Sequence, residues 1–272
     1  MKKERLDLVI FNKDMVDSRS LAQRIIMAGS VSVNGEIIFK PSHKISEDDV
    51  IIINHGPDFV SRGGEKLDKA LIEFGLTNLA SFVCVDVGSS TGGFTDCLLQ
   101  YGAKKVYSID VGYGILHWKL RNDMRVVVME RTNARYVEKL PEKIDMVTID
   151  ASFISLRVLL PVVRKWIEEN AIVVALIKPQ FEAGKKDAAK GAGVIRNTEI
   201  HEKILNEILE FSLSNGFEVK GLIKSPLIGP KGNIEFLVYL KKSKNPISLL
   251  GDFDAMVSKI IFANAENPDI IK

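Results

Sequence analysis

Four charged residues in this sequence stand where segments rich in Val, Ile and Leu come to an end. Asp86, Asp110 and Asp150 each close an apolar run. Lys178 directly follows the apolar run 171–177. Because the carboxyl ends of parallel strands meet at one edge of a sheet, we expect these side chains to converge on one cleft. A lysine beside a carboxylate can take a proton from an alcohol or steer its lone pair. The alternative is a set of unrelated salt bridges at the rim of the sheet.

A glycine-rich turn follows Asp86. Residues 82–95 read Phe-Val-Cys-Val-Asp-Val-Gly-Ser-Ser-Thr-Gly-Gly-Phe-Thr, which predicts a buried strand, a tight turn and a helix over 94–101. Glycines let the backbone approach a ligand, and the free N–H groups of the helix point at the turn. The spacing G-x-x-x-G-G differs from the dinucleotide pattern, and Asp86 would repel a pyrophosphate. The turn suits a ligand with a cationic amino-acid end, such as S-adenosylmethionine; an ordinary βαβ turn without a ligand is the alternative.

Two residues beyond the turn extend this candidate cofactor site. Asp110 would suit the ribose hydroxyls of an adenosyl ligand. Asn133 could meet the adenine edge, although a turn residue is an equal interpretation. The predicted cofactor contacts are Asp86, Gly88, Ser89, Ser90, Thr91, Gly92, Gly93, Phe94, Thr95, Asp110, Asn133 and Asp150.

The elements that must position these residues alternate between strand and helix patterns. Predicted strands cover 82–87, 105–110, 125–129, 144–150, 171–177, 217–223 and 234–240. Such alternation predicts an α/β fold with a doubly wound, mostly parallel sheet. The last two strands are joined by 224–232, which has no helix pattern, so we expect the final strand to be antiparallel. A helix over 65–74 places Lys66 in its first turn, where the helix dipole disfavours a cation.

Composition bounds the function classes. The chain has 272 residues and a net charge of +2, so bulk charge does not indicate nucleic-acid binding. We expect no membrane span and no signal peptide, because the longest apolar run is far below the ~20 residues a span needs. Cys84 and Cys97 lie in apolar surroundings and predict core thiols in a reducing compartment. The spacing of Cys and His suggests no metal site.

Residues 1–58 predict a small α+β unit. Helix patterns cover 5–12 and 19–28, and Asn34-Gly35 between two β-rich runs is a strong hairpin signal. A closing strand is expected over 49–53. Basic residues here could converge to meet phosphates, although a solvated basic face is an even alternative. The predicted RNA contacts in the whole chain are Arg5, Arg19, Arg24, Lys40, Arg62, Lys185, Lys186 and Lys190.

The pattern over about the first fifty residues resembles the RNA-binding domain first described in ribosomal protein S-four. The matching features include Ser18-Arg19-Ser-x-Ala22 and Gly29-x-Val31-x-Val33-Asn34-Gly35. The resemblance implies RNA contact through the second helix and the hairpin.

Longer motifs resemble the TlyA (hemolysin A) family, whose members are S-adenosylmethionine-dependent ribosomal RNA 2′-O-methyltransferases related to FtsJ-like enzymes. The motifs are SRGGEKL at 61–67, DVGSSTGGFT at 86–95, DASFIS at 150–155, KPQFE at 178–182 and GNIEF at 232–236. The resemblance covers about residues 1–242 and implies a Rossmann-like class I methyltransferase fold. It also implies a catalytic tetrad, which falls on Lys66, Asp150, Lys178 and Glu235. The implied substrate is a cytidine 2′-OH in small- and large-subunit ribosomal RNA.

The resemblance, together with the residue pattern of the C-terminal segment outside it, sets the expected organisation of the chain. We expect an RNA-binding domain at 1–58, a linker at 59–64, a methyltransferase domain at 65–245 and a C-terminal helical segment at 246–272. Residues 184–191 would form a basic loop beside the cleft that suits RNA phosphates, or a solvated surface loop. Cytoplasmic ribosomal RNA or ribosomal subunits are the expected partners, and the oligomeric state stays open. The alternatives are a membrane-active hemolysin and a non-catalytic RNA-binding or ribosome-assembly module.

Overall fold

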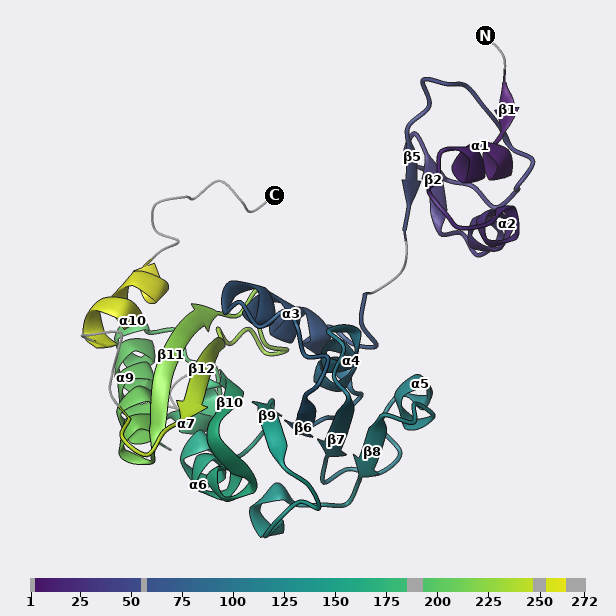
Figure 1. Ribbon diagram of the computed structural model, residues 1–272. Coiled ribbons are helices and arrows are strands. Elements are labelled where there is room, and N and C mark those ends of the chain that lie inside the picture. The colour runs from purple at the N-terminus through teal and green to yellow at the C-terminus, as the bar shows by residue number, and fades with distance from the viewer. Residues whose placement is uncertain (1–2, 55–57, 185–192, 247–252, 263–272) are drawn as a thin grey trace. The chain divides into compact units, whose positions relative to one another are not determined.

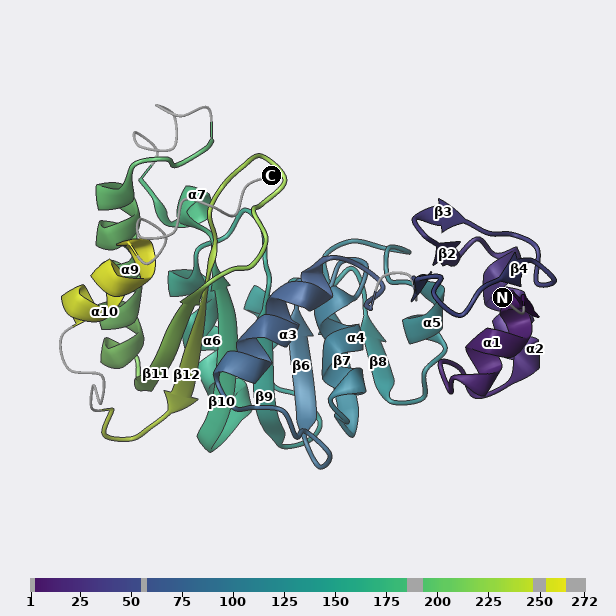
Figure 2. The ribbon, with the colours of Figure 1, turned by 90° about the horizontal axis from the view of Figure 1, so that it is seen from above.

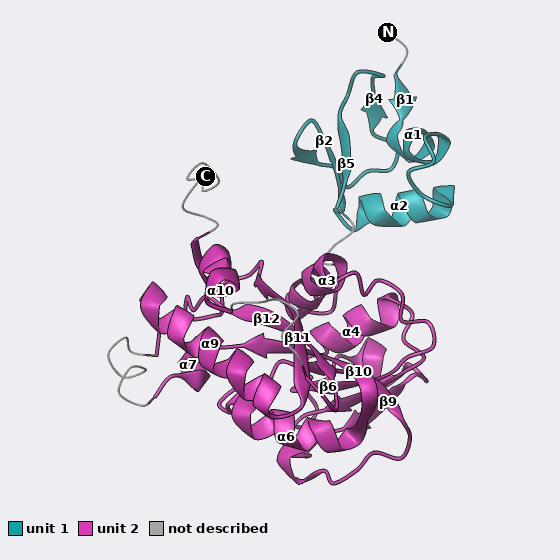
Figure 3. Ribbon diagram, turned by 60° about the vertical axis from the view of Figure 1, so that its left-hand side comes forward, with its two compact units in different colours: residues 1–58 teal, residues 59–272 magenta. Residues whose placement is uncertain are grey.

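The computed structural model of the chain describes residues 3–54, 58–184, 193–246 and 253–262, and the chain divides into two units, Met1–Asp58 and Phe59–Lys272 (Figure 3). Lys185, Lys186 and Lys190, three of the predicted RNA contacts, lie outside the described residues. The predicted linker 59–64 falls within the second unit.

The first unit pairs two helices with short antiparallel strands. Its elements are β1 (Glu4–Arg5), α1 (Leu6–Asn12), α2 (Arg19–Met27), β2 (Val31–Val33), β3 (Glu36–Ile37), β4 (Lys44–Ile45) and β5 (Ile51–Ile53). One sheet has the order β3-β2-β5, and β1 pairs with β4. Apolar side chains of both helices, among them Leu6, Ile10 and Ile26, form its core with Val31 of β2.

Local signals explain why these elements form. The Ser18 side chain accepts a hydrogen bond from the Leu21 N–H and so caps the start of α2. Asn34 and Gly35 both adopt positive φ, 52° and 88°, as the tight turn of a hairpin requires. The predicted hairpin is confirmed by the antiparallel pairing of β2 with β3.

A seven-stranded sheet forms the centre of the second unit (Figures 1 and 2). Its strands are β6 (Val83–Val87), β7 (Lys105–Ile109), β8 (Val126–Met129), β9 (Ile144–Ile149), β10 (Ile167–Ile177), β11 (Phe217–Lys224) and β12 (Phe236–Lys242). The strand order is β11-β12-β10-β9-β6-β7-β8. The pairs among β8, β7, β6, β9 and β10 are parallel, and β12 is antiparallel to both β10 and β11. The predicted antiparallel last strand is therefore confirmed.

Helices cover both faces of this sheet. The helices are α3 (Gly63–Glu73), α4 (Gly93–Gln100), α5 (Trp118–Arg121), α6 (Leu156–Trp166), α7 (Pro179–Glu182), α9 (Thr198–Ser214) and α10 (Phe253–Phe262), with a 3-10 turn η1 (Ala134–Tyr136). Side chains of α3 and α4 pack with Met146 of β9, whereas those of α6 and α9 pack with Val147, the next residue on that strand. Because successive strand residues face opposite sides, the sheet has a core on each face. The two cysteines, Cys84 of β6 and Cys97 of α4, are both buried in the core on the α3–α4 face of the sheet, as predicted.

Candidate active site

A pocket of about 530 Å³ lies at the carboxyl ends of the central strands of the second unit. All four members of the predicted tetrad, Lys66, Asp150, Lys178 and Glu235, line it. They come from the first turn of α3, from the ends of β9 and β10, and from the residue before β12. The structure thus brings together residues that the sequence places up to 169 positions apart.

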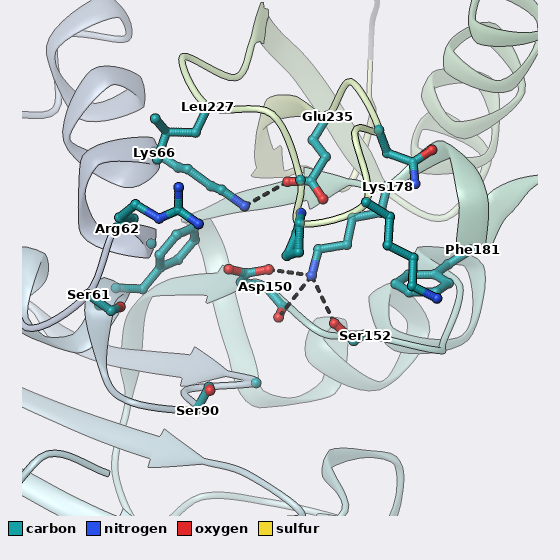
Figure 4. A pocket seen from close by; sticks show the side chains of 18 of the residues that line it. Ser61, Arg62, Lys66, Ser90, Asp150, Ser152, Lys178, Phe181, Leu227 and Glu235 are labelled. Carbon is teal, nitrogen blue, oxygen red and sulfur yellow. Dashed lines mark hydrogen bonds and ion pairs between the residues drawn. The ribbon is translucent and has the colours of Figure 1, made fainter. Parts of the chain in front are cut away.

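Lys66 and Glu235 form one ion pair of the pocket (Figure 4). Lys66 Nζ donates to Glu235 Oε2 at 2.6 Å. The side chains are 12% and 2% exposed, so water screens the pair weakly. A buried carboxylate needs such a partner, which explains why the helix tolerates a lysine in its first turn.

Lys178 and Asp150 form the second ion pair, with Lys178 Nζ 2.5 Å from Asp150 Oδ1. Lys178 also donates to the Ser152 hydroxyl at 3.1 Å and to the Asp150 carbonyl at 3.5 Å. The short contact is an ion pair, so the Asp150 carboxylate neutralises the nearly buried Lys178 ammonium and holds it at one place. A buried cation needs such a partner.

The glycine-rich turn forms a second wall of the pocket. Gly88 has φ 83°, and a Cβ there would lie 2.8 Å from the Asp150 carbonyl oxygen. A Cβ on Gly93 would lie 2.7 Å from the Gly64 nitrogen. Glycine is therefore required at both positions so that the turn can approach the Asp150 loop and the start of α3. The predicted cofactor contacts that line the pocket are Gly88, Ser89, Ser90, Thr91, Gly93, Phe94 and Asp150.

The structure does not bring the other predicted cofactor contacts to the pocket lining, namely Asp86, Gly92, Thr95, Asp110 and Asn133. Asp110 accepts hydrogen bonds from the N–H groups of Ser90 and Gly112, so it fixes the glycine turn. The exposed Asn133 accepts from the Arg135 N–H, as expected of a turn residue.

Asp86 lies fully buried beneath the turn, where it accepts hydrogen bonds from the hydroxyls of Thr95 (2.7 Å) and Thr148 (3.3 Å). Burial and, to a smaller extent, the charge of Asp150 raise the pKa of Asp86 from its ordinary value of 3.8 to about 7, against the lowering effect of the Thr95 and Thr148 hydrogen bonds. At this depth Asp86 is not part of the pocket lining, and its predicted contact with a cationic ligand stays a prediction.

The raised pKa of Asp86 predicts a pH-dependent stability. Between about pH 4 and pH 7 the folded protein keeps a proton that the unfolded chain has released, so the contribution of Asp86 to stability falls as the pH rises through this window. The Asp86→Asn variant is neutral throughout. We expect the unfolding free energy of Asp86→Asn, measured with urea, to increase relative to that of the wild type as the pH rises from 4 to 7.

The measurement is the difference between the two unfolding free energies at several pH values, in which titrations common to both proteins cancel. A difference that stays constant across this range would contradict the prediction.

The first unit holds four of the predicted RNA contacts, and two of them have protein partners. The fully buried carboxylate of Asp7 accepts hydrogen bonds from Arg5, Arg19 and Gln23. The Arg5 hydrogen bond holds the pKa of Asp7 well below its usual range, with support from Gln23 and Arg19 and against the effect of burial. Arg5 and Arg19 are thus less free to meet phosphates than the sequence indicates.

Arg24 and Lys40 are exposed. Neither of them forms an ion pair with the residues that the structure describes. Arg62 belongs to the second unit, where it is exposed and lines the pocket. The predicted RNA-binding role of these three residues stays a prediction.

Sequence reasoning missed two aromatic residues of the pocket, Phe153 and Phe181. Phe153 is 90% exposed, has φ 64° and lies with its ring centroid 5.0 Å from that of Phe181. The Lys178 ammonium lies 6.0 Å from the centre of the Phe181 ring. Phe153 lies within the motif DASFIS and Phe181 within KPQFE, so the two motifs could have indicated both residues. The exposure of Phe153, however, follows only from the fold.

Membrane-spanning helices and metal-binding clusters were both sought among the described residues. Among residues 3–54, 58–184, 193–246 and 253–262, no helix has the length and apolarity to span a bilayer. Those same residues contain no cluster of His, Cys, Asp and Glu that could hold a metal ion.

Comparison with known proteins identifies both units. Residues 59–242 match the FtsJ-like methyltransferase family, and residues 4–51 match the S4 domain. The 16S/23S rRNA (cytidine-2′-O)-methyltransferase TlyA of Mycobacterium tuberculosis is 37% identical over 260 residues, covering 94% of this chain and 96% of that protein. Hemolysin A of Brachyspira hyodysenteriae is 45% identical over 238 residues, covering 86% of this chain and 98% of that protein.

The fold agrees with this comparison. A solved structure from Streptococcus thermophilus, named as a hemolysin, superposes with a TM-score of 0.72 at 42% identity and covers 98% of this chain and 99% of that chain. The chain therefore belongs to the TlyA/hemolysin A family of rRNA methyltransferases, which join an S4 domain to an FtsJ-like methyltransferase domain.

Proposed function

We propose that this protein transfers a methyl group from S-adenosylmethionine to the ribose 2′-OH of a cytidine in ribosomal RNA, and that it does so in the cytoplasm. The similarity to a cytidine-2′-O-methyltransferase over 94% of the chain supports this substrate. The observation that carries the proposal is the pocket itself, in which two lysine–carboxylate pairs face a glycine-rich turn.

The residues of the turn fit S-adenosylmethionine. Gly88 and Gly93 let the backbone come close, and the turn that carries Ser89 and Ser90 leads into the N-terminus of α4. The pocket volume of about 530 Å³ lies in the range of small-molecule sites. Asp150 lines the pocket beside the turn and is 21% exposed, so a donor of the ligand can reach its carboxylate. When bound, S-adenosylmethionine supplies an activated methyl group on a sulfonium.

Lys178 is the residue that would act on that hydroxyl. Its ammonium is held at one place by Asp150 and Ser152, so it can donate a hydrogen bond to the 2′-oxygen and aim the lone pair of that oxygen at the methyl carbon. As the 2′-oxygen took the methyl group, and the electron pair of the broken carbon–sulfur bond stayed on the sulfur, Lys178 would pass one of its protons to the Asp150 carboxylate and take the hydroxyl proton in its place. Asp150 fixes Lys178, and Glu235 fixes Lys66 at the same wall. Positioning of this kind can contribute about 7–11 kcal/mol to lowering a barrier.

The exposed ring of Phe153 gives the RNA a surface beside this pair. Bases stack on aromatic side chains whatever their sequence, at roughly 1–3 kcal/mol per base. Phe153 lies in the loop that follows Asp150, and its ring packs on Phe181, three residues after Lys178. A nucleotide stacked there would have its ribose near the Lys178 ammonium.

The test is transfer of a labelled methyl group from S-adenosylmethionine to ribosomal subunits that lack the modification. A 2′-O-methyl group makes the adjacent phosphodiester resistant to alkali, so label is expected in an alkali-resistant dinucleotide. Label in a base, or no transfer to any ribosomal substrate with S-adenosylmethionine still bound, would contradict the proposed reaction.

Charge reversal in the S4 unit tests RNA binding by this unit. We expect Arg24→Glu and Lys40→Glu in the full chain each to weaken RNA affinity several-fold and to reduce the slope of log affinity against log salt, which is about 0.7–0.9 per phosphate contact. The affinity for S-adenosylmethionine should not change. RNA binding is measured at three salt concentrations.

The matched control is Lys13→Glu, another exposed lysine of the same unit, at the C-cap of α1. It makes the same charge change as Lys40→Glu at a residue outside α2 and the hairpin. An equal loss in all three variants would assign the effect to net charge and remove the specific role of Arg24 and Lys40.

A further inference from the structure

The loop that carries Asp150 supplies every polar partner that the described residues offer to the Lys178 ammonium. These partners are the Asp150 carboxylate, the Asp150 carbonyl and the Ser152 hydroxyl. A displacement of this loop would therefore move all of them together. The position of the Lys178 ammonium therefore depends on the contacts that fix the loop 150–155 against the segment that follows Lys178.

This loop is held in an unfavourable backbone conformation. Phe153 has φ 64°, a left-handed value that is unfavourable for a residue other than glycine. Such conformations persist only where surrounding contacts determine them. Phe153 is 90% exposed and packs only its ring on Phe181, so contacts of its neighbours along the chain must add to the constraint.

Glu182 supplies contacts at the far end of the loop. It ends α7, four residues after Lys178, and is only 8% exposed. Its carboxylate accepts hydrogen bonds from the Ser155 hydroxyl at 2.5 Å and from the Leu156 N–H at 2.7 Å. Ser155 is the N-cap of α6, and its hydroxyl oxygen in turn accepts from the Arg157 N–H.

The surroundings of Glu182 match an anchoring role. Hydrogen bonds to a carboxylate at a helix N-terminus are strong because the donors carry unmatched positive charge. The Arg157 guanidinium lies 3.6 Å from the carboxylate and also donates to Glu207 at 2.7 Å. Burial raises the pKa of Glu182, against the lowering effects of the Ser155 and Leu156 hydrogen bonds and of Arg157. Burial of the Glu182 carboxylate is thus unfavourable in itself, and both of its oxygens accept hydrogen bonds from the end of the loop and the start of α6.

These contacts close a ring. One side is the Asp150–Lys178 pair at the ends of β9 and β10, and the other is the contact of Glu182 with Ser155 and Leu156. We infer that Glu182 is a positioning residue that clamps the loop 150–155 to the segment 178–182 and so holds the Lys178 ammonium in its reactive place. This inference rests on the proposed methyl transfer for its kinetic consequence, but the clamp itself does not.

Two substitutions separate geometry from charge. Glu182→Ala removes both acceptors, and we expect kcat to fall at least about tenfold, since small misplacements of reacting groups are costly. KM for S-adenosylmethionine should change less than threefold, because the glycine turn is untouched. Glu182→Gln keeps an oxygen for the Leu156 N–H and an amide that can donate to Ser155, so it should restore most of kcat.

Glu207→Ala is the matched control, because Glu207 contacts the same arginine but not the loop. It should leave kcat unchanged. Wild-type kcat in Glu182→Ala, or a Glu182→Gln variant as impaired as Glu182→Ala, would overturn the inference. Circular dichroism and thermal unfolding of each variant show that the proteins compared are folded.

Amide hydrogen exchange separates failure of the clamp from failure of the proposed reaction. Exchange at residues 151–157 of the full chain should be faster in Glu182→Ala than in the wild type, and unchanged in Glu182→Gln and Glu207→Ala. This pattern supports the clamp even if the wild-type protein shows no methyl transfer. Unchanged exchange in Glu182→Ala would overturn the clamp even if the wild-type protein is active.

Discussion

Replacing Lys178 with alanine is expected to lower the rate of methyl transfer by about a hundred- to ten-thousandfold, the usual range for loss of a general acid or base. The reason is that Lys178 is the buried cation that Asp150 and Ser152 hold in the pocket. S-adenosylmethionine affinity should change little, because the glycine turn does not depend on this side chain. The measurement is single-turnover transfer of labelled methyl to unmodified ribosomal subunits, with cofactor binding measured separately.

Loss of Lys178 leaves Asp150 without its cation, so stability must be checked alongside activity. Lys178→Met keeps the aliphatic length and the packing on Phe181 while it removes the ammonium, and should be as inactive as Lys178→Ala. Lys165→Ala removes an exposed lysine from the last turn of α6 and should be fully active. A folded Lys178→Met protein with the wild-type rate would remove Lys178 from the mechanism.

Gly88→Ala is expected to weaken S-adenosylmethionine binding at least about tenfold and to destabilise the second unit. An alanine there would be forced to a left-handed φ, at a cost of roughly 1–2 kcal/mol. Its Cβ would also meet backbone, 2.8 Å from the Asp150 carbonyl oxygen and 2.9 Å from the Ala151 Cα. Backbone atoms cannot move out of the way by a side-chain rotation, so the glycine-rich turn and the Asp150 loop must move apart. The measurements are cofactor titration and urea unfolding.

Gly75→Ala is the matched control for this substitution. Gly75 has a similar positive φ of 67°, but a Cβ there would have no atom within 4 Å. It follows α3 and should show the backbone cost alone, with normal cofactor binding. If both variants lose the same stability and Gly88→Ala still binds S-adenosylmethionine normally, the close approach of the turn to Asp150 has no functional role.

The sequence by itself determined the elements and the identity of the charged groups. Most strands of the sheet contain an apolar run that is visible in the sequence, and the hairpin at Asn34-Gly35 follows from backbone conformations that few other residues adopt. The placement of Asp150 and Lys178 at one edge followed from the parallel direction of β9 and β10. These predictions succeeded because they depend on local periodicity and on the direction of neighbouring strands.

Only the tertiary structure decided which charges meet. Because β12 inserts between β10 and β11, it carries Glu235 to Lys66, a pairing that no local pattern specifies. The same holds for Asp7, which binds Arg5 and Arg19, and for Asp86, which lies beneath the turn and not in the pocket. The exposure of Phe153 and the contact of Glu182 with the α6 N-terminus also depend on how separate segments pack. Burial and pairing are sums over neighbours that are distant in sequence, which is why a chain read residue by residue gives the groups of this site but not their partners.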